Sequence, residues 1–204
     1  MKKHLLLFFF VLAGKSFAQY PILNDSIKKP GIYKTFDEFK NNSPSIPLNY
    51  TILSKRNTLF TNWGKESINT YAVKMPIEES RAIGSVFGFC DGFYFYVLAK
   101  ELMLFPESVH KFLFFRVDGM GKYPYLDMVI QVNYTMASNN GFDMISVPTI
   151  DLAVINFETG EIKKLTVKMM KEILADKPQL LERFKNQERK NDYLKVYLKE
   201  YLKN

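Results

Sequence analysis

Cys90 and His110 are the two side chains of this sequence that could act together as a nucleophile and a base. A thiol and an imidazole catalyse acyl transfer when a third group orients the imidazole, and no residue near His110 supplies that group. Cys90 is the single cysteine and lies in an apolar stretch, which is typical of a small buried hydrophobic residue. We interpret Cys90 as buried, with a reactive thiol or an intermolecular disulfide as the alternatives, and His110 as a surface or hydrogen-bonded histidine.

Three carboxylates, Asp118, Asp127 and Asp143, could gather around Ca²⁺, but the sequence lacks the alternating Asp-x-Asp-x-Asp-Gly loop of a dedicated calcium site. Two carboxylates suffice for glycoside hydrolysis. The chain has 21 acidic residues, so many pairs are available and none is singled out. A carboxylate-based hydrolase therefore stays a distant alternative.

The segment Gly119-Met120-Gly121-Lys122 is rich in glycine but has neither the spacing nor the Ser/Thr of a phosphate-binding loop. It is more typical of a tight turn that Asp118 begins. The sequence also has no Gly-x-Ser-x-Gly elbow, and it has only two histidines, of which His4 lies in the N-terminal signal described next. It therefore predicts no catalytic, cofactor-binding or metal-binding residue, and we lean towards a protein that is not an enzyme.

The N-terminus has the features of a signal peptide spanning residues 1–18. Basic residues precede an apolar run from Leu5 to Ala13, and Ser16 and Ala18 are small residues at −3 and −1 of a cleavage site. The apolar run is shorter than the ~20 residues that cross a bilayer. The sequence therefore predicts export, with cleavage after Ala18, and a periplasmic or secreted location.

Composition excludes several classes of protein. Of the 204 residues, 47% are hydrophobic, which excludes a disordered chain, and a single cysteine excludes a disulfide scaffold. Removal of the signal peptide lowers the net charge from +7 to +4, and much of the remaining excess alternates with acids near the C-terminus. A diffuse surplus of this kind disfavours nucleic acid as a partner.

The pattern of elements predicts one α+β domain over residues 31–204, after a flexible leader over residues 19–30. Thr35 and Glu38 form a capping-box pattern that begins a short helix, which stops before Pro44. Asp91-Gly92 is the strongest hairpin signal, between apolar strands 86–89 and 93–98. Further strands are expected at the segments 50–60, 68–75, 112–117, 128–134 and 150–157, with a turn at 158–161 leading to another short strand. Short connections predict a mostly antiparallel sheet, open or strongly curled towards a barrel.

The C-terminal segment 166–203 is expected to be helical. Thr166 can cap one helix, and Asp176 with Pro178 can begin the next. A stripe at helical spacing follows, comprising Tyr193, Leu194, Tyr197, Leu198, Tyr201 and Leu202. This stripe is expected to pack on the sheet or on a partner chain, and a membrane surface is the alternative. The N-terminal and C-terminal helices should together cover a face of the sheet.

Three motifs resemble small exported proteins of Bacteroidota that have no assigned activity. They are Gly31-Ile32-Tyr33-x-Thr35-Phe36-x-Glu38-Phe39, the turn Gly88-Phe89-Cys90-Asp91-Gly92, and the tail Glu158-Thr159-Gly160-x-Ile162 with Asp176-x-Pro178-x-Leu180-Leu181-x-x-Phe184. The resemblance implies a bacterial envelope or secreted location and transfers no site residue. It does not extend to residues 123–142.

Two main functions remain open. The first is a non-catalytic interaction module of the envelope or exterior, which binds a macromolecule through exposed aromatic side chains or the C-terminal Tyr/Leu helix. The 12 Tyr and 18 Phe of the sequence are suited to such a surface. The second is a protein that binds an apolar or glycan ligand in a cavity between the sheet and the helices. A formed, apolar-lined cavity would favour the second.

Overall fold

The computed structural model describes residues 21–24, 28–61, 64–98, 113–138 and 141–203. Their helices and strands form an α+β fold with two antiparallel sheets, and neither sheet closes into a barrel. The predicted fold class is thus confirmed. The strands are β1 (Gly31–Tyr33), β2 (Thr51–Thr61), β3 (Gly64–Lys74), β4 (Gly88–Cys90), β5 (Phe95–Leu98), β6 (Phe114–Arg116), β7 (Tyr125–Ser138), β8 (Gly141–Ile155) and β9 (Ile162–Lys164). The α-helices are α1 (Pro21–Asn24), α2 (Phe36–Lys40), α3 (Ile77–Ile83), α4 (Val167–Ile173), α5 (Pro178–Asn186) and α6 (Leu194–Lys203).

The first sheet has six strands in the order β1-β4-β5-β6-β3-β2, and β5 lies between two neighbours as a central strand. Phe95, Tyr96 and Val97 are all buried, so both faces of β5 are covered, as its apolar pattern predicts. The β4–β5 hairpin also turns at Asp91-Gly92 as predicted. The prediction that the strand starts at Phe93 is wrong, because the chain is still in the turn there.

Helix α2 covers the N-terminal part of this sheet. The Thr35 hydroxyl accepts a hydrogen bond from the Glu38 N–H at 3.2 Å, so the predicted cap is confirmed. The Glu38 carboxylate accepts from the Lys34 N–H at 2.6 Å, one residue earlier than in a capping box. The ring of Phe39 is buried among other aromatic rings, with centroids 5.0 Å from Phe87 and 5.1 Å from Phe95.

The N-terminal motif, the Gly-Phe-Cys-Asp-Gly turn and the first part of the tail motif meet in this core. Gly31 pairs with Cys90 across β1 and β4, which joins the N-terminal motif to the Gly-Phe-Cys-Asp-Gly turn. Gly160, in the tail motif, has φ +77° and lies so close to Phe36 that a Cβ atom there would be 2.5 Å from the ring. These three parts are therefore accounted for by packing: they bring β1, β4, α2 and the β8–β9 turn together. The second part of the tail motif, with Leu180 and Phe184, packs instead in the cluster of the C-terminal helices.

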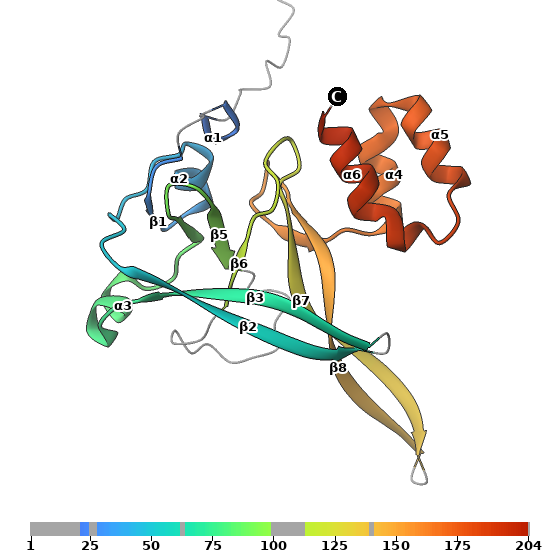
Figure 1. Cartoon of the computed structure of the whole chain (residues 1–204), viewed down its shortest axis with the longest axis horizontal. Coiled ribbons are helices and arrows are strands. Elements are labelled where there is room, and N and C mark those ends of the chain that lie inside the picture. The colour runs from blue at the N-terminus through green and yellow to red at the C-terminus, as the bar shows by residue number, and fades with distance from the viewer. Residues whose placement is uncertain (1–20, 25–27, 62–63, 99–112, 139–140, 204) are drawn as a thin grey trace, which may run out of the picture.

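The second sheet has the order β7-β8-β9 and is dominated by one long two-stranded ribbon, in which β7 pairs with β8 from Tyr125↔Val154 to Ser138↔Gly141. The prediction of a single sheet is wrong, because this ribbon does not join the first sheet. It contacts the β2–β3 ribbon, and its far end projects beyond the rest of the chain (Figure 1). The short strand predicted after residues 158–161 is β9, which pairs with the end of β8.

Helices α4, α5 and α6 gather at the opposite end of this ribbon (Figure 1). Thr166 caps α4 by accepting from the Met169 N–H at 3.2 Å, as predicted. The prediction that Asp176 caps α5 is wrong: Lys177 occupies the N-cap position, and the Asp176 carboxylate accepts a hydrogen bond from the Tyr201 hydroxyl at 2.9 Å. The helices therefore cover the second sheet, while α2 packs on the first, and they do not share one face.

The predicted stripe of α6 is packed inside the chain. Its buried members contact a cluster that includes Tyr125 and Val154 of the second sheet, and they are Leu194, Tyr197, Leu198 and Tyr201. The prediction that this stripe packs on a sheet is confirmed, and it leaves little of the stripe for a partner or a membrane. None of the helices in the described part of the chain has an apolar run long enough to cross a bilayer.

Two segments complete the comparison with the predictions. In the stretch expected to be a flexible leader, α1 places Ile22 in a core cluster to which both sheets contribute. Helix α3 has no counterpart among the predicted elements, because its seven residues are too few to show a helical period. The predicted signal peptide lies outside the described residues.

Candidate interaction surface

The turn between β4 and β5 presents two aromatic side chains to solvent. Phe93 is 74% exposed and Tyr94 is 47% exposed, whereas Phe95, the next residue, is 1% exposed. A large apolar side chain that stays exposed forgoes the favourable free energy of burial. Exposed aromatic residues are also the type most enriched in binding hot spots. These two residues are therefore the best candidates for a contact surface.

Asp91 holds the turn in one conformation. One of its carboxylate oxygens accepts hydrogen bonds from the N–H groups of Phe93 at 2.7 Å and Tyr94 at 2.6 Å. Its other oxygen accepts from the hydroxyl of buried Tyr96 at 2.9 Å. Gly92 has φ +95°, a backbone conformation that favours glycine. The aromatic pair is thus presented on a pre-organised turn, which lowers the entropic cost of binding.

Two cations flank the exposed rings. The Lys28 ammonium donates a hydrogen bond to the Phe93 carbonyl at 2.6 Å and lies 5.9 Å from the centre of the Tyr94 ring. The Arg116 guanidinium lies over the same ring at 4.9 Å, within the range of a cation–π interaction. We name the set Phe93, Tyr94, Lys28 and Arg116 the aromatic turn surface. Spacing along the chain does not reveal it, because Lys28 and Arg116 are 88 positions apart.

Asp118 and Asp127, two of the three carboxylates considered for Ca²⁺, do come together in the structure. The ammonium of Lys195 lies between them, 3.0 Å from Asp118 and 2.5 Å from Asp127. Burial alone would lower the pKa of Lys195, but hydrogen bonds and charge interactions with both carboxylates outweigh it and raise that pKa. This cluster connects α6 to the second sheet. The Lys195 ammonium occupies the position between the two carboxylates at which a metal ion or a substrate would have to bind.

Two candidates of the sequence remain, Asp143 and His110. The backbone of Asp143 pairs with Met136 in the far part of the β7–β8 ribbon, nine positions along β7 from Asp127. His110 lies outside the described residues, so the structure does not place it relative to Cys90. Among the residues that the structure describes, no three His, Cys, Asp or Glu side chains are arranged to hold a metal ion.

Cys90 is fully buried, which confirms its interpretation as a core residue. Burial raises the pKa of its thiol to about 11; a hydrogen bond from the Gly92 N–H at 3.3 Å opposes this shift and the charge of Asp91 adds to it. The thiolate is the reactive form of cysteine, so this environment suppresses its nucleophilicity at neutral pH.

The glycine-rich segment that resembles a phosphate loop is a turn, as predicted. The Asp118 N–H donates to the Tyr125 carbonyl at 2.8 Å, and Gly119 bridges to Tyr125. A Cβ atom on Gly121 would lie 2.9 Å from the Leu202 side chain, and Lys122 donates to the Tyr201 hydroxyl at 3.5 Å. The turn therefore packs against α6.

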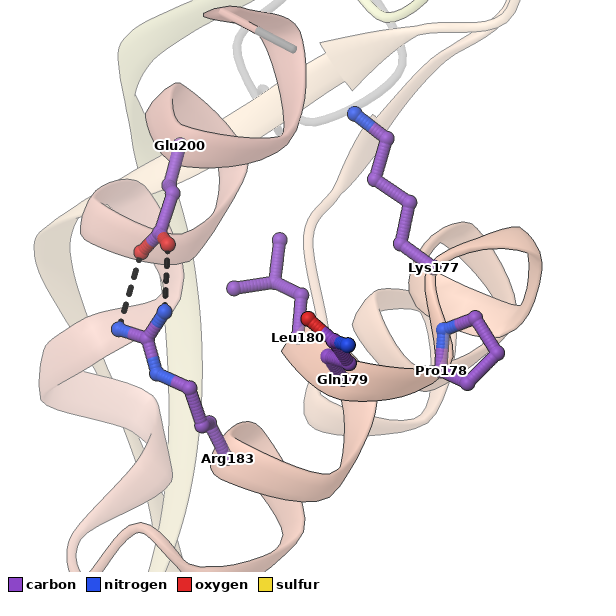
Figure 2. Close-up of a pocket in the computed structure, with 6 residues that line it drawn as sticks. All are labelled: Lys177, Pro178, Gln179, Leu180, Arg183 and Glu200. Atoms are coloured by element: carbon purple, nitrogen blue, oxygen red, sulfur yellow. Dashed lines mark hydrogen bonds and ion pairs between the residues drawn. The ribbon is translucent and has the colours of Figure 1, made fainter.

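A pocket of about 510 Å³ lies between α5 and α6, in the size range of small-molecule sites (Figure 2). Its charged groups are engaged with each other or with the backbone. Arg183 and Glu200 form a two-fold ion pair across it at 2.6 and 3.2 Å, and Lys177 donates to the Tyr201 carbonyl at 2.6 Å. This is not the apolar cavity between sheet and helices that would favour a ligand-binding protein.

The fold and these surfaces define a two-sheet α+β protein that presents an aromatic turn flanked by cations to solvent. A family model described as a family of unknown function, DUF6563, matches residues 31–204, and the chain belongs to that family. The match begins at the first residue of β1, so it includes both sheets and the C-terminal helices. No curated protein and no solved structure is significantly similar to the chain.

Proposed function

We propose that this chain is an exported, non-catalytic interaction module that binds a macromolecular partner through the aromatic turn surface. The observation that supports this most directly is the 74% exposure of Phe93 on a turn fixed by Asp91. A rigid turn that holds an apolar ring in solvent gains nothing for folding, but it does favour association. Export rests on the pattern of residues 1–18 and places the partner in the envelope or outside the cell.

The surface has the composition of a protein contact. Aromatic residues and arginine are the types that contribute most to hot spots, and here Phe93, Tyr94 and Arg116 lie together. Asp118 and Asp127, the two candidate carboxylates that come together, are both paired with Lys195, and this arrangement does not favour the hydrolase alternative.

Site-specific photocrosslinking tests the proposal. A photoreactive phenylalanine analogue is placed at Phe93 or, as a control on another exposed apolar residue, at Ile77, which is 49% exposed. We expect a discrete adduct from position 93 in the native envelope and none from position 77. An excess of unlabelled chain should abolish the adduct, and an excess of Phe93→Asp chain should not. Equal adducts at both positions, or competition by the Phe93→Asp chain, would contradict the proposal.

A further inference from the structure

β7 has a long edge that no other described strand covers. Among the described residues it pairs with β8 alone, and none of them is hydrogen-bonded through its backbone to the other edge of β7 beyond Tyr125. An open strand edge presents unpaired N–H and C=O groups that can pair with another strand, and natural proteins usually protect such edges with charges, proline or shortness. We therefore compare the β7 edge with the other edges of the two sheets.

The other edge strands are each protected in one of these ways. β1 and β9 have three residues each, and β9 carries Lys163 and Lys164. β2 carries Lys55 and Arg56 in its middle. β9 pairs with β8 only from Ala153 to Ile155, and the rest of this edge of β8 has Pro148, which cannot donate a backbone hydrogen bond.

The hydrogen-bonding register shows which way each backbone group of the ribbon points. The Asp118 N–H donates to the Tyr125 carbonyl from outside the ribbon, so Tyr125 faces the open edge of β7. The direction of the backbone N–H and C=O groups alternates along an antiparallel strand, so those of Gln131 and Asn133 also point to that edge. Their partners, Pro148 and Ser146, face the opposite edge, that of β8. Pro148 thus removes a donor from the β8 edge and leaves the β7 edge intact.

The sequence of β7 favours a second copy of the chain as the strand that covers this edge. The eleven residues from Met128 to Ser138 include no charged residue and no proline. Two such strands can pair antiparallel about a two-fold axis without bringing like charges opposite each other. Every copy offers the same open edge, which is the requirement for a symmetric dimer.

We propose that two copies of this chain form a dimer by antiparallel pairing of their β7 edges. The two β7–β8 ribbons then join into one continuous four-stranded sheet. A two-stranded ribbon that projects into solvent is marginally stable by itself, and additional strands stabilise it. This inference is independent of the aromatic turn surface, which belongs to the other sheet.

Two proline variants of the same residue pair test the proposal. Asn133→Pro removes a donor from the open edge of β7, whereas Ser146→Pro removes the matching donor from the β8 edge. Neither variant breaks a β7–β8 hydrogen bond, so the damage to the ribbon is matched. Light scattering of the purified chain should give twice the mass of one chain for the wild type and for Ser146→Pro, and the mass of one chain for Asn133→Pro.

A monomeric wild type would overturn the proposal, as would a dimeric Asn133→Pro chain or a monomeric Ser146→Pro chain. Amide hydrogen exchange of the wild type provides a test that does not depend on how the variants fold. The N–H groups of Gln131, Asn133 and Thr135 should become protected as the protein concentration rises. Protection that does not change with concentration would count equally against a dimer at this edge.

Discussion

Phe93 and Phe95 offer a sharp test of the tertiary structure, because they are two residues apart and chemically identical. Strand alternation would place them on the same face and give them similar burial. In the structure Phe95 is 1% exposed and Phe93 is 74% exposed. Replacing each by alanine should therefore have very different effects on the free energy of unfolding.

The magnitudes follow from the buried area. A phenylalanine side chain buries about 200 Å² when enclosed, and at about 25 cal/mol per Å² its loss amounts to about 5 kcal/mol. Measured Phe→Ala substitutions in cores cost about 3–5 kcal/mol, which we expect for Phe95→Ala. Phe93 buries about a quarter of that area, so Phe93→Ala should cost at most about 1 kcal/mol.

Urea unfolding followed by circular dichroism measures both variants. The Phe95→Ala midpoint should fall markedly, and in a thermal scan its Tm should fall by about 6–20 °C, at about 2–4 °C per kcal/mol for a chain of this size. The Phe93→Ala chain should unfold close to the wild type, so it can also serve as a folded variant in binding experiments. Equal midpoints for the two variants would refute the burial assigned to this hairpin, and an altered urea dependence would mean that the unfolding reaction itself had changed.

Two further predictions concern the core around Cys90 and the tail motif. In urea unfolding, Gly160→Ala should destabilise the chain by about 1–3 kcal/mol more than Gly84→Ala. The two glycines have similar positive φ of +77° and +71°, but only at Gly160 would a Cβ atom meet a side chain, that of Phe36. Equal losses of stability would contradict this contact. Burial raises the folded-state pKa of Cys90 to about 11, above its unfolded value of about 8.5, so the stabilisation is complete below the unfolded value and is lost as pH rises towards the folded one. Between those pH values we expect the free energy of unfolding to fall by about 2–3 kcal/mol less for Cys90→Ala than for the wild type, and identical pH profiles would show that the thiol is not buried.

Local sequence signals predicted most of the elements, since their causes are local. Thr35 and Thr166 cap helices because a hydroxyl three residues before a free N–H can reach it in any context. Asp91-Gly92 forms a hairpin turn because glycine accepts a positive φ. The prediction that Asp176 caps α5 failed for a reason that is not local. Its carboxylate had a suitable position for a cap, but Tyr201, which is 25 residues away, donates a hydrogen bond to it.

The candidate surface could not be predicted in the same way. Exposed aromatic rings differ from buried ones only in whether other parts of the chain pack on them. No local sequence pattern indicates which rings those parts will cover. Lys28 and Arg116 reach the Tyr94 ring from distant parts of the chain. Lys195 likewise meets Asp118 and Asp127 only after α6 packs on the second sheet.

By itself, the sequence determined the antiparallel α+β class, the capped helices, the β4–β5 hairpin and the apolar stripe of α6. Each follows from the spacing of neighbouring residues, and hydrogen bonds and side-chain periodicity act over a few positions. Only the tertiary structure decided that the strands divide into two sheets, that β7 keeps an open edge, and that Phe93 stays in solvent while Phe95 is buried. Those outcomes depend on contacts between residues far apart in the chain, and such contacts form only when the whole fold encloses them.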